Sequence, residues 1–130
     1  MSVELEVEKA LFARLAALSG LSYSWPGVPY QGTTPFVEVH GLRSGSDRIA
    51  QDGLSVYRGA LQAAIVHRAD GGLPEAMDQA SQIKAHFPTD LQIVAGDYRV
   101  HIYKAPDIGS ADLDGNTIRV PVSIYPQTFG

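Results

Sequence analysis

The sequence predicts an α+β fold: a two-layer sandwich in which two helices cover a mainly antiparallel four-stranded sheet, in the order α-β-β-α-β-β. Two stretches with apolar residues at helical spacing indicate the helices. Runs of β-branched and aromatic residues around them indicate strands, and their links allow antiparallel pairing. Residues 1–130 are predicted to form a single domain, because this length suits one core and no linker or repeat is visible.

The first helix is predicted from Val3 to Leu18. Ser2 is a suitable N-cap, acidic residues in the first turn suit the helix dipole, and Gly20 is a typical stop. The apolar stripe consists of Val3, Val7, Leu11, Leu15 and Leu18. Residues 21–35 are rich in proline, glycine and aromatic side chains, so they are predicted to be an extended, irregular connector.

The middle of the chain predicts two strands and the second helix. Phe36–Leu42 alternates and is predicted to be a strand, whereas Arg43–Gly53 is polar and is predicted to be a long exposed loop. A long strand starts at Ser55, and because both of its faces are fairly apolar it is predicted to be central. After the turn Ala69–Gly72, the second helix is predicted from Pro74 to His86.

The last third of the chain predicts a hairpin and a closing strand. Leu91–Val94 and Tyr98–Lys104 flank a short turn, which is a hairpin signal. Ala105–Asn116 is predicted to be a second long polar loop, and Thr117–Tyr125 the closing strand. Pro121 cannot donate a ladder hydrogen bond, so this strand is predicted to lie at an edge or to be bulged there.

The composition excludes several classes of function. The net charge is −4 and no Lys/Arg run is present, which argues against a duplex-binding protein, so no sequence-specific nucleic-acid partner is expected. The absence of cysteine removes thiol nucleophiles, disulfides and thiolate metal sites. No signal peptide and no membrane-spanning apolar run is visible, so no membrane partner is predicted.

Candidate chemical motifs are weak. The four histidines, His40, His67, His86 and His101, show no metal-ligand spacing, and we interpret them as separate strand or surface residues. A small enzyme stays open as an alternative if His40, His67 and His101 gather with carboxylates in a cleft. The sequence "DLDGN" departs from a calcium loop and is better explained by an Asp-Gly hairpin turn. No catalytic residue, cofactor or metal is predicted.

Several stretches, taken in order, resemble the phage tail terminator-like proteins of long-tailed bacteriophages. They are "LFARLAALSG", "YSWPGVPYQGTTPFVEV", "YRGALQAAIVHRADGG", "AMDQASQIKAHF" and "IRVPVSIYPQ". One departure is the "PG" of Pro26 and Gly27, where the family pattern has an Asn before Val-Pro. That departure affects any capping role of the side chain but not the fold.

The resemblance implies a structural protein without catalysis. Family members form a ring, typically of six subunits, on the end of the tail tube, which stops tube polymerisation and offers a surface for joining the head. The implied partners are other copies of the chain, the tail tube protein and a head-completion or connector protein. The implied location is the virion tail, after assembly in the host cytoplasm. Another phage or prophage tail-completion or neck protein stays open as an alternative.

A ring needs two different patches on each subunit, and the sequence offers candidates for them. Aromatic residues beside prolines in the connector and charged residues in the two long polar loops suit contacts with neighbours. The candidate interface residues are Trp25, Tyr30, Arg43, Asp47, Arg48, Asp52, Asp107, Asp112 and Asp114.

Overall fold

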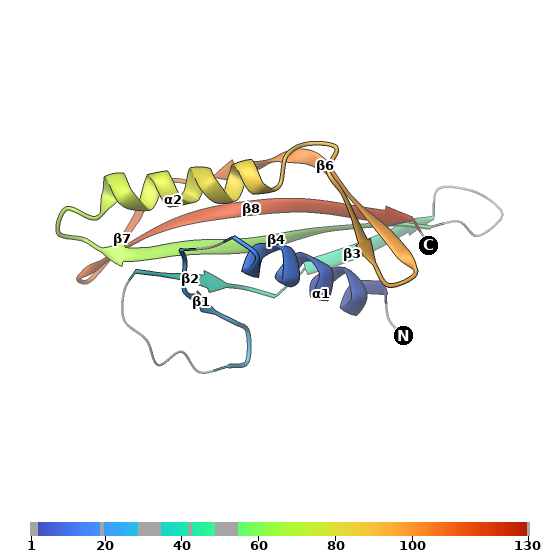
Figure 1. The fold of residues 1–130 in the computed structure, drawn as a ribbon, viewed down its shortest axis with the longest axis horizontal. Coiled ribbons are helices and arrows are strands. Elements are labelled where there is room, and N and C mark those ends of the chain that lie inside the picture. The colour runs from blue at the N-terminus through green and yellow to red at the C-terminus, as the bar shows by residue number, and fades with distance from the viewer. Residues whose placement is uncertain (1–2, 19, 29–34, 42, 49–54, 130) are drawn as a thin grey trace.

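The computed structural model describes residues 3–18, 20–28, 35–41, 43–48 and 55–129. Two helices and eight strands lie within these residues (Figure 1). Their bounds are α1 (Val3–Ala16), β1 (Tyr23–Ser24), β2 (Phe36–Val39), β3 (Arg43–Arg48), β4 (Ser55–Arg68), α2 (Leu73–His86), β5 (Gln92–Ala95), β6 (Tyr98–Ile108), β7 (Asp112–Asp114) and β8 (Thr117–Phe129).

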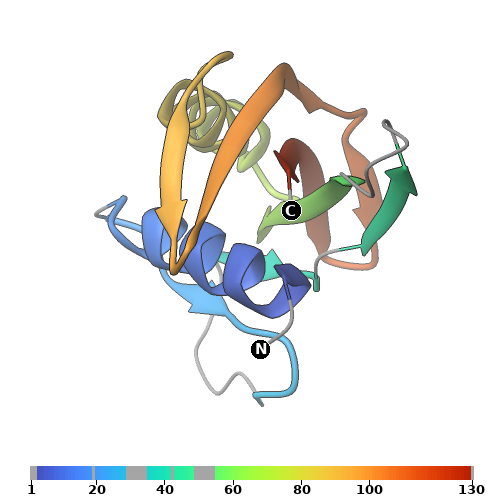
Figure 2. The same ribbon diagram turned by 90° about the vertical axis from the view of Figure 1, so that its right-hand side faces the viewer.

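The described strands form one mixed, curled sheet in the order β1-β2-β4-β8-β6-β5, with β3 paired to β4 and β7 paired to β8. Only the β1–β2 pair is parallel among these pairings. Both helices lie on the same side of the sheet (Figure 2). The α+β class with two helices is therefore confirmed, but the predicted four-stranded sheet and the order α-β-β-α-β-β are wrong.

Helix α1 follows the predicted apolar stripe. Val7, Leu11 and Leu15 are buried and belong to the hydrophobic core, where α1 packs against β5 and β6. The helix ends at Ala16, two residues before the predicted end. Tyr23 caps that end, because its hydroxyl lies within donating distance of the carbonyl oxygens of Leu15 (2.8 Å) and Leu18 (3.1 Å) in the last turn. The Leu15 carbonyl also accepts from the Leu18 N–H at 3.1 Å.

Helix α2 follows β4 after a tight turn. Pro74 lies in the first turn as predicted, and Ala76, Ala80 and Ile83 face the core against β4, β8 and β6. Gly72 is required at the helix start, since an added Cβ would lie 2.1 Å from the carbonyl oxygen of Arg68 and 2.5 Å from Nδ1 of His67. The second glycine of the "GG" pair is thus explained by close packing.

Strands β4 and β8 form the central antiparallel ladder of the sheet. The register pairs Leu61 with Ile124 and Ile65 with Val120, and all four side chains are fully buried. The other face of β4 also contains buried apolar residues, Ala64 and Val66. The prediction that this strand is central is confirmed.

Pro121 was expected at an edge or a bulge, and the edge alternative is wrong because β8 lies between β4 and β6. The carbonyl of Pro121 accepts a hydrogen bond from the Gly109 N–H at 2.8 Å, so the proline nitrogen also points to that side. There β6 ends at Ile108 and β7 begins only at Asp112. The missing N–H therefore faces a break between two partner strands, which explains how a proline is accommodated in a central strand.

Two predicted loops contain strands. Residues 43–48 form β3, which pairs along residues 55–60 of β4, and the second predicted loop contains the end of β6 and all of β7. Neither stretch has an alternating apolar pattern. Neither needs one, because backbone pairing to a long central strand holds each of them in place. The β5–β6 hairpin is confirmed, with Gly96 at φ 61°, and the Asp-Gly turn is confirmed between β7 and β8, with Gly115 at φ 60°.

Candidate interaction surface

The face of the sheet opposite the two helices, called the open face below, is the candidate functional surface. Alternation places Leu61, Ala63 and Ile65 of β4 toward the helices and their neighbours toward the open face. The register extends this division to β8, β6 and β2. Polar and aromatic side chains dominate the open face, so it has the chemistry of a solvated or contacting surface.

A bidentate ion pair crosses β4 on the open face. The guanidinium of Arg119 on β8 donates to both carboxylate oxygens of Glu38 on β2, at 3.0 and 3.2 Å. Ala64 lies on β4, between β2 and β8, and its small side chain leaves room for the ion pair. The ion pair in turn covers Ala64, which explains why this residue is only 1% exposed. His40 Nε2 lies 3.0 Å from the same carboxylate. The ion pair therefore links β2 to β8 across β4 from the solvent side.

A shallow groove of about 470 Å³ lies beside this ion pair. It is lined by apolar residues, Ala64, Ala111 and Pro121, together with polar ones such as Gln62 and Asp112. Its lining holds one cationic side chain, Arg119, and one anionic side chain, Asp112, so it favours neither a simple anion nor a simple metal ion. We interpret it as a surface depression between β4 and the start of β7.

A second cluster on the open face combines two tyrosines with cations. The rings of Tyr103 and Tyr125 lie 6.4 Å apart between centroids, Lys104 Nζ lies 4.5 Å from the Tyr125 ring centre, and Arg58 lies 5.6 Å from the Tyr103 ring centre. The Tyr125 hydroxyl donates to Asp107 at 2.7 Å. That hydrogen bond is the main cause that lowers the pKa of Asp107 and raises the pKa of Tyr125.

A chain of polar contacts leads away from this cluster. Arg58 Nε donates to Gln127 at 3.1 Å, Gln127 Nε2 lies 3.3 Å from His101 Nδ1, and His101 Nε2 lies 2.9 Å from Asp90. Asp90 adopts a positive φ of 70° in the turn before β5. The contacts run from β4 across β8 and β6, so the open face is held in one arrangement by side chains as well as by the ladder.

The aromatic residues of the connector pack inward. Trp25 lies 5.1 Å from Phe12 and 5.2 Å from Tyr23 between ring centroids, and it contacts the hydrophobic core. Burial raises the pKa of Tyr23. Packing accounts for the described contacts of Tyr23 and Trp25.

The histidines do not gather at one place. His40 lies 3.0 Å from Glu38, His67 lies 3.3 Å from Glu75, and His101 contacts Asp90, so each meets a different carboxylate on a different element. The described residues contain no group of three or more metal-ligating side chains arranged to hold an ion. The enzyme alternative depended on such a cluster and loses its motivation.

The structure distributes the candidate interface residues over several places. Trp25 packs on α1, Asp107 joins the tyrosine cluster, and Asp112 lines the groove. The backbones of Arg43, Asp47 and Arg48 lie on β3, and that of Asp114 lies on β7. Tyr30 and Asp52 lie outside the described residues. No single site brings the described candidates together, so their role in contacts stays a prediction.

Sequence reasoning missed the residues that dominate the open face: Arg58, Tyr103, Lys104, Arg119 and Tyr125. A signal was present for Arg58, Arg119 and Tyr125, which lie on the opposite alternation to the core residues of their strands and are of types enriched at protein interfaces. Tyr103 and Lys104 are consecutive, and the register of β6 against β8 shifts at this point. The signal needs the register before it can be read, since the strands that bring Arg58 and Tyr103 together are far apart in the sequence.

Comparison with known proteins decides the family. The family described as "Phage tail terminator protein" matches residues 6–125. The chain belongs to the phage tail terminator protein family. The suspected resemblance is thus confirmed, and this tail terminator family member is a phage structural tail protein of the virion rather than a member of an enzyme family.

Solved structures share the fold of this terminator family member. One, whose name gives no functional description, has a TM-score of 0.80 at 21% identity and covers 98% of this chain and 96% of its own. Another comes from the virion of a native gene transfer agent particle, with a TM-score of 0.73 at 11% identity and full coverage of both chains. No curated protein matches the chain significantly in sequence. No helix among the described residues is long and apolar enough to cross a membrane.

Proposed function

We propose that this tail terminator family member forms a ring on the end of the tail tube, where it stops tube polymerisation and offers the surface for joining the head. The observation that carries the proposal is the family match over residues 6–125, which includes most of α1, all of α2 and nearly all of the sheet. The geometry supports it, because the protein has a rigid core on one side of the sheet and an open face with interface-type side chains on the other.

The partners follow from this role. They are further copies of the chain, with six in the ring as the first expectation, the tail tube protein, and a head-completion or connector protein. We propose one domain for residues 1–130, since the described strands belong to one sheet over one core. The chain assembles in the host cytoplasm and acts by shape, without catalysis.

The test is assembly in the absence of the protein. Particles made without it are expected to carry tails of abnormal, unregulated length, seen by electron microscopy, and added purified protein should restore the normal length. Tails of normal length without joined heads would instead assign the chain to tail completion or the neck. Tails that are normal and joined would contradict both roles.

A further inference from the structure

The tyrosine cluster leaves cationic charge on the open face. We define the open-face patch as Arg58, Tyr103, Lys104 and Tyr125. Lys104 lies 3.7 Å from Asp107, whereas the contacts described for Arg58 are with Gln127 and the Tyr103 ring, neither of which bears opposite charge. Tyrosine and arginine are the residue types that dominate binding energy at protein interfaces. The open-face patch therefore suits an acidic partner surface.

The outer surface of α2 has the complementary chemistry. We define the helix patch as Leu73, Glu75, Met77 and Asp78. Leu73 and Met77 are each 40% exposed and the Glu75 side chain is 62% exposed, so this part of α2 presents both apolar and acidic groups to solvent. The first basic residue of α2 is Lys84, so the first half of the helix has a net negative charge.

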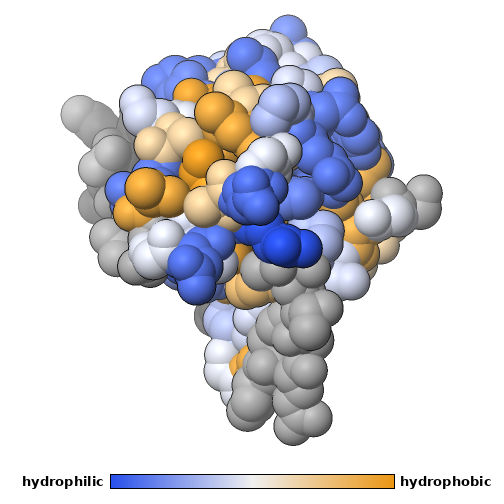
Figure 3. All heavy atoms as spheres, turned by 90° about the vertical axis from the view of Figure 1, so that its left-hand side faces the viewer, coloured by the Kyte–Doolittle hydropathy of each residue, from blue (hydrophilic) through white to orange (hydrophobic). Residues whose placement is uncertain are grey.

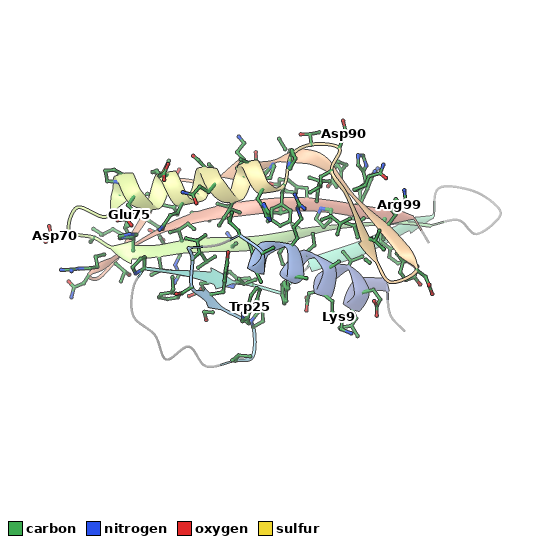
Figure 4. All side chains as sticks on the ribbon, viewed as in Figure 1. Lys9, Trp25, Asp70, Glu75, Asp90 and Arg99 are labelled. Carbon is green, nitrogen blue, oxygen red and sulfur yellow. The ribbon has the colours of Figure 1, made fainter. Side chains whose placement is uncertain are left out.

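Figure 3 views the end of the molecule near the start of α2, where hydrophobic residues lie among charged ones. Figure 4 shows Asp70 and Glu75 at that end, far from Arg99.

The fold holds the two patches on opposite sides. Ala76, Ala80 and Ile83 attach α2 to the helix side of β4 and β8 and leave Leu73, Met77 and Asp78 exposed. Glu75 lies at the edge of the helix patch, where its exposed carboxylate is also 3.3 Å from His67 Nε2 on β4. The open-face patch lies on the other side of the same strands, and one copy can therefore present both without overlap. A closed ring requires this arrangement, because its contacts join two different surfaces.

We infer that the open-face patch of one copy receives the helix patch of the next copy. This inference rests on the proposed ring and names the surfaces that form it. Arg58 and Lys104 meet the carboxylates of Glu75 and Asp78, while Leu73 and Met77 lie against the tyrosine rings, which are favourable partners for a methionine sulfur. Charge complementarity selects the head-to-tail contact over contact between two identical patches, which would repel.

The experiment uses charge reversal on the full chain, with native mass measured by analytical ultracentrifugation over a range of concentrations. Arg58→Glu and Asp78→Lys alone should each raise the concentration needed for assembly at least tenfold, because like charges then face each other. An equal mixture of the two variants should assemble again, since every contact in an alternating ring is then complementary. The double variant Arg58→Glu/Asp78→Lys should also assemble. Rescue by mixing shows that each variant is folded.

Matched controls reverse charges elsewhere. Lys9→Glu on α1 and Asp97→Lys in the β5–β6 turn change exposed residues outside both patches and should assemble as the wild type does. Single variants that assemble normally, or a mixture that fails to rescue two defective variants, would overturn the pairing while leaving the ring intact.

Two further outcomes discriminate between explanations. A wild-type chain that stays monomeric at every concentration and on purified tubes would contradict the ring and the pairing together. If the wild type binds a DNA duplex and Arg58→Glu loses this binding without any change in assembly, the open-face patch serves nucleic acid and the inference is wrong.

Discussion

The two faces of the central sheet differ in what holds them. On the helix side, Leu61, Ile65 and Ile124 are fully buried and join one hydrophobic core with both helices. On the open face, the contacts are ion pairs, cation–ring contacts and hydrogen bonds between partly exposed groups. Burial stabilises far more strongly than exposed polar contacts do. The helix side of the sheet therefore determines the fold, and the side chains of the open face are free to be selected for contacts with other subunits.

The largest effect is expected from the helix side. Leu61→Ala removes a fully buried side chain and should lower the free energy of unfolding by about 2–5 kcal/mol. Gln62→Ala changes the next residue of the same strand, on the open face, and should stay within about 0.5 kcal/mol of the wild type. Urea unfolding followed by circular dichroism measures both. Equal losses would abolish the distinction between the faces.

The next effect tests how far the tight packing extends toward the start of α2. Gly72→Ala should cost about 1–3 kcal/mol of unfolding free energy, because the new methyl group overlaps Arg68 backbone and the His67 ring. Gly71→Ala is the matched control: its φ of 74° costs about 1 kcal/mol for a non-glycine residue, but no atom lies within 4 Å of the new methyl group. Thermal unfolding compares them, and a more damaging Gly71→Ala would contradict the packing argument.

A smaller effect is expected from the ion pair across β4. Glu38→Gln should lower the free energy of unfolding by about 0.5–1 kcal/mol, because solvent screens partly exposed groups. A double-mutant cycle with Arg119→Gln isolates the interaction, which should weaken at high salt. A coupling energy as large as the loss from Leu61→Ala would show that the open face also determines stability.

The smallest effect concerns the Tyr125–Asp107 hydrogen bond. The folded pKa of Asp107 is lowered, so its contribution to stability is present above the ordinary value of 3.8 and is lost as the pH falls through the folded pKa. Tyr125→Phe removes the main cause and should raise the Asp107 pKa toward 3.8. Carboxyl carbon shifts in an NMR titration measure this directly. An unchanged Asp107 pKa in Tyr125→Phe would show that Lys104, and not the tyrosine, perturbs it.

The helix side was predictable from the sequence because buried apolar residues recur at the regular spacing of a helix or strand. The spacing of Val7, Leu11 and Leu15 located α1, and apolar residues at helical spacing after Pro74 located α2. The continuous apolar character of β4 indicated a central strand for the same reason. Each of these signals is local, so no knowledge of the partner element was needed.

The open face and the minor strands were not predictable in this way. β3 and β7 have no apolar alternation, because pairing to β4 and β8 supplies their hydrogen bonds whatever their side chains are. Pro121 suggested an edge strand, since the break between β6 and β7 that accommodates it cannot be seen in the sequence of β8. The tyrosine cluster depends on register across three strands, which only the folded sheet supplies.

The crossing of β4 by Arg119 and Glu38 has a consequence for how errors in strand alignment are rejected. The two residues are 81 positions apart, so the contact forms only when the first and last parts of the sheet have both docked. A shift of β8 by one residue would turn Arg119 toward the hydrophobic core, where a guanidinium without its carboxylate partner is strongly disfavoured. The ion pair therefore stabilises the correct register of β8 relative to the register shifted by one residue.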